Sequence, residues 1–363
     1  MKDQLFLRIL TVLAVLASLP FAARAEPYLA VGQGFKCVAC HVNPTGGGLR
    51  NALGIAFART TIPAHQLPAD APMWTGGIGD FLRLGGDLRH DWSRTKVTGQ
   101  PVQSGWDLQE FRLYGDLSVL PNRLGIHVDQ LMAPGSSQSR EAYMRLSTSD
   151  GTWGLKGGKF YLPFGWRLQD QSAFVRQVTG ISMTTPDTGI EAGLELPEWS
   201  AQLALTNGTA NAGKGSGHQL TGQAVWVHPM GRIGLAASST QSNSGDRRMA
   251  GVFGGLHTGP LVWLGEVDLV RDEGFPEGAR KLLAGLGEVN WGLRRGHNLK
   301  LTLEYFDPDR KVREDQKGRV SLVYELTPLP FVQLRLGFRR WNGIPQNALD
   351  NRKLLFLELH AFM

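Results

Sequence analysis

Residues 299–306 read LKLTLEYF, and this stretch decides the fold. Side chains of a β-strand point alternately to its two faces. Leucines and a tyrosine take the odd positions here, whereas Lys300, Thr302 and Glu304 take the even ones. The segments RVSLVYEL at 319–326 and VQLRLGFRR at 332–340 separate their faces in the same way. The pattern predicts strands with one apolar and one polar face.

The same alternation of apolar and polar residues recurs from about residue 79 to residue 363, in segments of roughly ten residues. This is the signature expected of an outer-membrane barrel. Short connections such as HPMGR and GLRRGH alternate with longer polar ones such as SRTKVTGQPVQSG at 93–105 and DPDRKVREDQKG. Tight periplasmic turns opposite longer extracellular loops produce this alternation. We therefore predict an all-β fold, a transmembrane antiparallel β-barrel of about 16 strands over residues 79–363. Its longest connection, from about Tyr161 to Pro186, is expected to fold inward and narrow the lumen.

The first 25 residues have the features of an export signal. A basic start at Lys2 and Arg8 precedes an apolar run and small residues around Arg24, which predicts a signal peptide, residues 1–25, cleaved before Glu26. Cleavage would remove three basic residues and Asp3, so the net charge of +6 would become +6 − 3 + 1 = +4, too mild an excess to indicate a nucleic-acid partner. The mature protein is expected in the outer membrane, in contact with its lipid.

The segment from 26 to 75 carries the chemistry. CVACH, from Cys37 to His41, matches C-x-x-C-H, in which two thiols attach haem covalently and the adjoining imidazole ligates the iron. The chain has no other cysteine, which excludes a disulfide-stapled scaffold. A redox-active or structural disulfide and half of a zinc site are the alternative interpretations of the motif. We favour one covalent haem c, with Cys37, Cys40 and His41 as its binding residues.

The rest of this segment is turn-rich, with one short helix expected in LRNALGIAFAR, and it is predicted to plug the barrel from the periplasmic side. Three glycines at 46–48 would let the backbone pass close to the porphyrin, although a plain flexible turn explains them equally well. For the sixth iron ligand we favour His65 because it lies in the same segment. Met73, His127 and His360 are the alternatives, the last two because they would face the lumen.

Several charged residues are expected to line the lumen, where they would hold the plug or haem propionates: Arg83, Asp87, Arg89, Glu110, Arg112, Asp116, Arg335, Arg339 and Glu358. Tryptophans near the predicted strand ends would suit the aromatic girdles of the membrane interfaces, although ordinary β-sheet aromatics explain any single one equally well: Trp92, Trp106, Trp263, Trp291 and Trp341. Acidic residues in the long loops would suit a metal ion, although ordinary solvated charge is the commoner role.

An exported chain with CVACH soon after the signal peptide and a barrel-like remainder resembles the fused monohaem cytochrome-porins of bacterial outer membranes. The specific part of the resemblance is Cys37, Cys40 and His41. It implies an electron carrier, associated in that family with oxidation of extracellular ferrous iron.

Three hypotheses follow. In the first, the barrel-held haem transfers electrons between an extracellular metal ion or mineral and a periplasmic c-type cytochrome, which makes the protein an extracellular iron oxidoreductase only if iron is its substrate. In the second, the protein is a porin whose haem segment is a gate or sensor. The third, a soluble periplasmic haem enzyme, needs a pocket with acid or base residues, which the sequence does not reveal.

Overall fold

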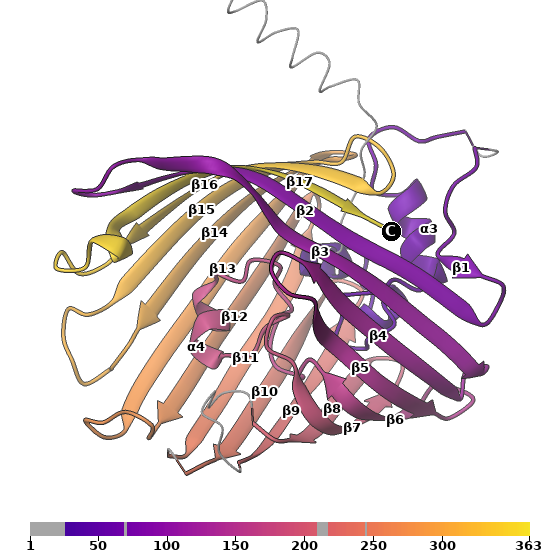
Figure 1. Cartoon of the computed structure of the whole chain (residues 1–363), viewed down its shortest axis with the longest axis horizontal. Coiled ribbons are helices and arrows are strands. Elements are labelled where there is room, and N and C mark those ends of the chain that lie inside the picture. Colours follow the sequence, from indigo (N-terminus) through magenta and orange to yellow (C-terminus); the bar gives the residue numbers. More distant parts are fainter. Residues whose placement is uncertain (1–25, 69–70, 209–216, 244) are drawn as a thin grey trace, which may run out of the picture.

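The computed structural model describes residues 26–68, 71–208, 217–243 and 245–363. The predicted signal peptide, 1–25, lies outside the described residues. Within them, sixteen antiparallel strands pair each with the next, and the last pairs with the first to close a barrel (Figure 1). The prediction of an all-β barrel of about 16 strands is confirmed.

The wall strands have the following bounds: β2 Leu82–Val97, β3 Gln103–Leu120, β4 Leu124–Ala133, β5 Gln138–Ser147, β6 Trp153–Phe160, β7 Asp187–Glu195, β8 Trp199–Thr206, β9 His218–His228, β10 Gly231–Gln241, β11 Arg247–Thr258, β12 Leu261–Asp272, β13 Arg280–Arg294, β14 His297–Asp307, β15 Lys317–Leu326, β16 Val332–Asn342 and β17 Arg352–Phe362. A two-residue strand, β1 (Gly77–Ile78), pairs with the start of β2. The helices are short: α2 Pro27–Gly32, η1 Cys37–Ala39, α3 Ala52–Thr60, α4 Phe174–Thr179 and η2 Ala348–Asn351. None of the helices in the described ranges is long and apolar enough to cross a membrane.

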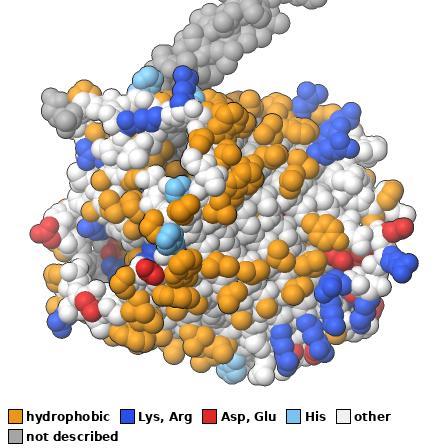
Figure 2. Space-filling model, turned by 180° about the vertical axis from the view of Figure 1, so that it is seen from behind, with side chains coloured by type: hydrophobic (Ala, Val, Ile, Leu, Met, Phe, Trp, Pro, Cys, Tyr) orange, Lys and Arg blue, Asp and Glu red, His pale blue; other side chains and the backbone are white. Residues whose placement is uncertain are grey.

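The alternation read from the sequence decides which face each side chain takes. In β14, Leu303 is 54% exposed whereas Thr302 is 5% exposed. In β16, Leu336 and Phe338 are exposed while Gln333 and Arg335 are buried in the lumen. Figure 2 shows the result on one outer face, where hydrophobic side chains cover the wall and charged ones gather mainly toward its ends. This surface suits contact with lipid.

The tryptophans divide between the two faces. Trp106, Trp263 and Trp291 are exposed on the outside, as an aromatic girdle requires. The expectation for Trp341 was wrong, because that side chain is buried and lies beneath the guanidinium of Arg319. Its position on β16 shares the parity of the lumen-facing residues, so the strand itself turns it inward.

The connections at one end of the barrel are mostly longer than those at the other, as predicted, although residues 134–137 between β4 and β5 form a shorter connection than residues 148–152 between β5 and β6. β2 runs on to Val97 and β3 begins at Gln103, so most of the expected loop 93–105 is strand. The β2–β3 ladder reaches the pair Thr95–Gln103. Tertiary pairing between the two strands thus extends the sheet through residues whose polarity resembles a loop.

The lumen of this barrel is packed. The longest connection, residues 161–186, folds inward as predicted and is called the inward segment below; its helix α4 lies against β12, β13 and β14. Phe164, Trp166 and Val175 of this segment are buried in one apolar cluster with inward side chains of β9–β13, including Phe253. Such a layer between the strands has the character of a protein core, not of a water-filled channel.

Residues 26–68 and 71–75 are called the plug. They lie at the end of the lumen that carries the short turns (Figure 1). Lys36 Nζ lies 2.6 Å from Glu195 Oε2 beside the β7–β8 turn. The backbone amides of Ala64 and His65 donate to Thr327 and Pro328 in the β15–β16 turn, at 2.8 and 3.0 Å. The plug is therefore fixed to several short turns at one rim.

Candidate functional site

The CVACH motif forms a single turn clipped to helix α3. The turn η1 covers Cys37–Ala39, and the amide of His41 donates to the carbonyl of Cys37 at 3.0 Å. Asn51 caps α3 by accepting from the amide of Gly54, and its Nδ2 donates to the carbonyls of Val38 and Ala39, each at 3.0 Å. One side chain thus caps the helix and holds the motif against it.

Gly54 explains how closely the helix approaches the motif. A β-carbon at this position would lie 2.1 Å from the carbonyl oxygen of Cys40. That distance is far inside van der Waals contact, and a backbone oxygen cannot rotate away as a side chain can. The site therefore requires glycine at position 54.

The three glycines after the motif all adopt left-handed backbone, with φ of 88°, 78° and 62° at Gly46, Gly47 and Gly48. Non-glycine residues rarely adopt this region. A β-carbon on Gly46 would also contact Cys37 Sγ at 3.4 Å. The stretch is thus a tight turn whose backbone lies close to Cys37. Its conformation requires glycine, unlike that of an ordinary flexible turn.

Cys37, Cys40 and His41 line one cavity inside the lumen, called the lumen cavity below, with about 1380 Å³ of empty space. This space is not fully enclosed, and part of it is open to solvent. Phe35, Phe57 and Trp166 supply apolar lining. The inward segment covers the cavity on the side of the long loops.

The two cysteines form no disulfide, and burial shifts the pKa values of Cys40 and His41. Both cysteines are free thiols. Burial and the neighbouring Cys37 raise the pKa of Cys40 above its ordinary value, although Arg50 opposes the shift; reactive redox cysteines have lowered pKa values instead. Burial, reinforced by the charge of Arg50, lowers the pKa of His41 to about 3, so the ring is neutral and able to ligate metal.

Cationic side chains surround the cavity. Arg50, Arg89 and Arg232 each bury a guanidinium nitrogen that has no hydrogen-bond partner among the described residues. Buried donors are normally satisfied, and guanidinium groups pair well with carboxylates. The propionates of a haem would supply such carboxylates. The free thiols, the neutral imidazole, the turn at Gly46–Gly48 and the unpaired guanidinium nitrogens together fit a covalent haem.

The structure separates the four candidates for the sixth ligand. His65 is exposed at the rim and does not line the lumen cavity, and Met73 also lies away from it. His127 is buried in the lumen between Asp116 and Glu141 but does not line the cavity. His360, on β17, does line it, together with His41. The local residue favoured from the sequence is thus not the one brought to the motif.

Sequence reasoning missed several lining residues. Trp166, Arg167 and Met183 reach the cavity from the inward segment, and Arg232 reaches it from β10. The parity of β10 could have identified Arg232, whereas nothing in the sequence shows which residues of a long irregular connection point inward. Of the predicted lumen charges, Asp87, Arg89 and Arg112 line the cavity.

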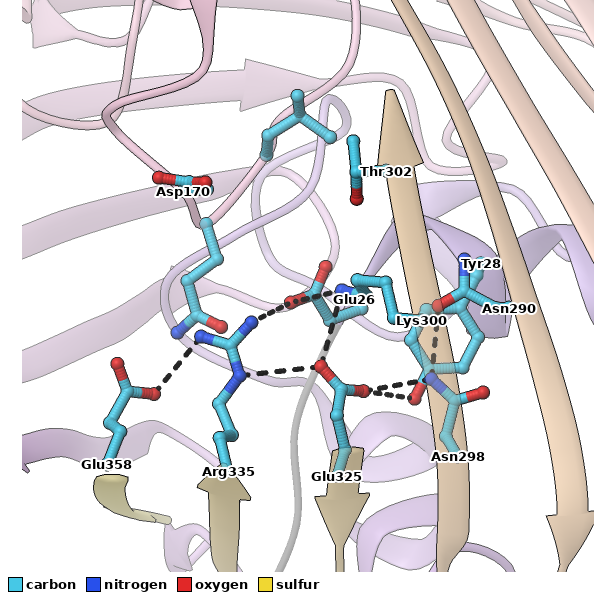
Figure 3. A network of polar contacts seen from close by, with 12 residues as sticks. Glu26, Tyr28, Asp170, Asn290, Asn298, Lys300, Thr302, Glu325, Arg335 and Glu358 are labelled. Carbon is cyan, nitrogen blue, oxygen red and sulfur yellow. Dashed lines mark hydrogen bonds and ion pairs between the residues drawn. The ribbon is translucent and has the colours of Figure 1, made fainter. Parts of the chain in front are cut away.

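A network of buried charges ties the start of the plug to β14–β17 (Figure 3). Lys300 Nζ lies 3.2 Å from Glu26 and 3.3 Å from Glu325, and Arg335 lies 3.4 Å from Glu325 and 3.3 Å from Glu358. The opposed charges compensate one another, as buried ions require. Within the described ranges, no group of three or more His, Cys, Asp or Glu is placed to hold a metal ion.

Solved structures share this architecture. OmpTdeltaL8 of Vibrio cholerae is 11% identical with a TM-score of 0.60, and covers 78% of this chain and 99% of its own. The anion-selective porin from Comamonas acidovorans gives the same values. The outer membrane channel DcaP of Acinetobacter baumannii is 12% identical with a TM-score of 0.61, over 78% and 97%. The fold is that of the outer-membrane porins. No family model and no curated protein matches the sequence.

The porin-like barrel differs from an open channel in its contents. The matched 78% of the chain leaves out a share comparable to residues 1–25 together with the plug. The plug and the inward segment occupy much of the lumen, which holds an apolar core, a charged network, the lumen cavity and a second space between the plug and β3–β7.

Proposed function

We propose that the protein carries electrons across the outer membrane on one covalently bound haem held in the lumen cavity. The observation that carries the proposal is that Cys37, Cys40 and His41 line a cavity inside a porin-like barrel. Bound there, haem would supply one-electron chemistry. The barrel's own residues would hold it in place: the thiols by covalent attachment, His41 as a ligand, and Arg50, Arg89 and Arg232 toward the propionates.

The location follows from the barrel. A closed barrel with an apolar outer face suits an outer membrane, and short turns face the periplasm in such barrels. The plug would then lie at the periplasmic end, within reach of a soluble c-type cytochrome. An extracellular metal ion or mineral, such as iron in its ferrous or ferric form, would exchange electrons at the long-loop end.

The packed lumen favours electron transfer over solute passage. Phe164, Trp166 and Val175 lie with Phe253 in the apolar layer beyond the cavity. An apolar layer excludes hydrated solutes, whereas an electron needs no open path. The outer membrane is an electrical insulator, so one haem can exchange electrons with partners on both sides only if it lies inside the barrel.

The test is a haem stain on outer-membrane fractions with reduced-minus-oxidised absorbance. We expect covalent haem in the wild type, its loss when Cys37→Ala and Cys40→Ala are combined, and a strongly altered spectrum or loss in His41→Ala. His65→Ala is the matched control, because it changes a histidine of the same plug outside the cavity, and it should keep its haem. Absence of haem from the wild-type barrel would overturn the proposal.

A second candidate, a porin with the plug as gate or sensor, is favoured by the shared fold with channel proteins. A smaller space beside the cavity, lined by Glu26, Lys300 and Arg339 together with apolar residues such as Leu168 and Val323, is where a narrow path would run. In liposomes, the electron carrier would reduce an enclosed dye without ion conductance. Conductance that persists in Cys37→Ala would establish the porin instead.

A further inference from the structure

His360 lies on the last strand of the barrel and faces the lumen cavity that His41 also lines. We propose that His360 is the sixth ligand of the haem iron, which rests on the haem-binding function proposed above. A side chain from the barrel wall would then complete a coordination that the plug begins.

The first argument is an unpaired buried atom. His360 is 1% exposed, and its Nδ1 is buried without a hydrogen-bond partner among the described residues. A buried polar atom left without a partner is unfavourable. Ligation of a metal in the adjacent cavity would use that nitrogen.

The second argument is the way the ring is held. Nε2 of His360 is paired with Asp87, and the other carboxylate oxygen of Asp87 accepts from the hydroxyl of Tyr114 at 2.5 Å. Arg89 lies 3.6 Å from the same carboxylate. Metal-bound histidines commonly give their second ring N–H to a carboxylate, which fixes the ring and its tautomer. This arrangement leaves Nδ1 as the available ligand.

The other candidates lack one of these features. Both ring nitrogens of His127 are also buried and unpaired, but they face Asp116 at 3.6 Å and Glu141 at 3.9 Å, away from the cavity. Met183 does line the cavity, near Gly47. A thioether sulfur is a weak hydrogen-bond acceptor, so its burial without a partner is not unfavourable. The position of Met183 therefore gives no evidence for a metal, whereas the unpaired nitrogen of His360 does.

The proposal makes coordination depend on barrel closure. His41 neighbours the cysteines in the sequence, whereas His360 reaches the cavity only because β17 pairs with β2 to close the wall, with His360 opposite Arg89. Attachment through the thiols needs only the plug. His360 would become available to the iron only when the barrel has formed.

The experiment compares the full-length, haem-loaded protein, purified in detergent, as wild type, His360→Ala, His127→Ala and Met183→Leu. Electron paramagnetic resonance and visible absorbance of the ferric form report the spin state. We expect low-spin haem in the wild type and in the His127 and Met183 variants. We expect loss of the low-spin signal in His360→Ala, with its recovery on adding imidazole.

Folding is checked by the mobility shift of unheated samples on gels. If His360→Ala does not fold, His360→Gln, which keeps a polar partner for Asp87, takes its place. A His360 variant that folds and stays low-spin without imidazole overturns the proposal, as does loss of the low-spin signal in Met183→Leu alone. A wild type without covalent haem would instead refute the haem-binding function itself.

Discussion

Strands β9–β13 and strands β14–β17 belong to one sheet and follow the same alternation, yet the side chains that they direct into the lumen differ in polarity. The first group presents apolar side chains such as Val225, Phe253 and Leu264, which pack against the inward segment. The second presents Lys300, Glu325 and Arg335 in a buried charged network. One wall therefore behaves as a protein core and the other as the polar lumen of a porin. The lumen cavity is lined by residues of β8–β11 on one side and of β17, β2 and β3 on the other.

The largest expected effect tests the ion pair that interrupts the apolar wall. Arg176 of α4 pairs with Glu266 of β12, both almost fully buried. Arg176→Met leaves an uncompensated carboxylate in apolar surroundings, which should cost about 3–5 kcal/mol of unfolding free energy. Urea titration in detergent micelles, followed by tryptophan fluorescence, measures the loss.

The double variant Arg176→Met, Glu266→Gln is the control. It removes both charges and keeps an acceptor for the amide of Trp166, which lies 3.3 Å from Glu266. We expect it to regain most of the lost stability. If the double variant is as unstable as the single one, the ion pair stabilises the protein through interactions other than charge compensation. The apolar wall would then depend on a polar interaction, and the two walls would differ less.

The next effect belongs to the charged wall and depends on pH. Asp170 of the inward segment lies 2.9 Å from Arg319 and 3.0 Å from Arg339. Burial alone would raise the pKa of Asp170, but the charges of the two arginines and the hydrogen bonds of Ser172 outweigh it and hold the pKa well below its ordinary value. Asp170→Asn should therefore cost about 1.5–3 kcal/mol at neutral pH.

The sign of the pH dependence follows from the lowered pKa. A carboxylate whose folded pKa is depressed stabilises the protein above its unfolded pKa, near about 4, and loses that contribution as the pH falls further. The difference between wild type and Asp170→Asn should thus shrink on acidification below that value. Asp246→Asn, which removes an exposed pair with Arg248, is the control and should change little. A difference that is constant with pH would contradict the assignment.

The smallest effect is expected at the rim, where neither wall encloses the charges. Lys36 pairs with Glu195 at 2.6 Å, and both side chains are partly accessible to solvent. Lys36→Ala should cost about 1 kcal/mol or less, and less still at high salt. A loss as large as that for Arg176 would mean that the plug is fixed by its rim contacts and not by the walls.

The sequence was sufficient where the determinants are local. Alternation over ten residues decides strand and face, so it predicted the barrel and the orientations of Lys300 and Arg335. The length of the connection 161–186 and its place as the third long loop, which porins often fold inward, predicted that it folds inward. Asn51 and Gly54 lie within a few turns of the motif, and the short helix that they anchor was expected there.

The sequence was insufficient where distant segments meet. His65 was favoured as a ligand because it is near His41 in the chain, but its backbone binds the β15–β16 turn instead. His360 reaches the cavity through closure of the sheet, a relation that no local pattern encodes. Trp341 shows a different failure, because an aromatic residue near a strand end was assigned to the membrane interface although its parity directs it inward.

The contact between Gly54 and the carbonyl of Cys40 constrains how this sequence can diverge. Any descendant that keeps the C-x-x-C-H turn clipped to the helix has no room for a side chain at position 54. A descendant that loses the two cysteines and the histidine no longer needs the close approach, and alanine, which favours helix by roughly 1 kcal/mol over glycine, would become the better residue. Glycine at this position should therefore be inherited together with the motif and be replaced where the motif has been lost.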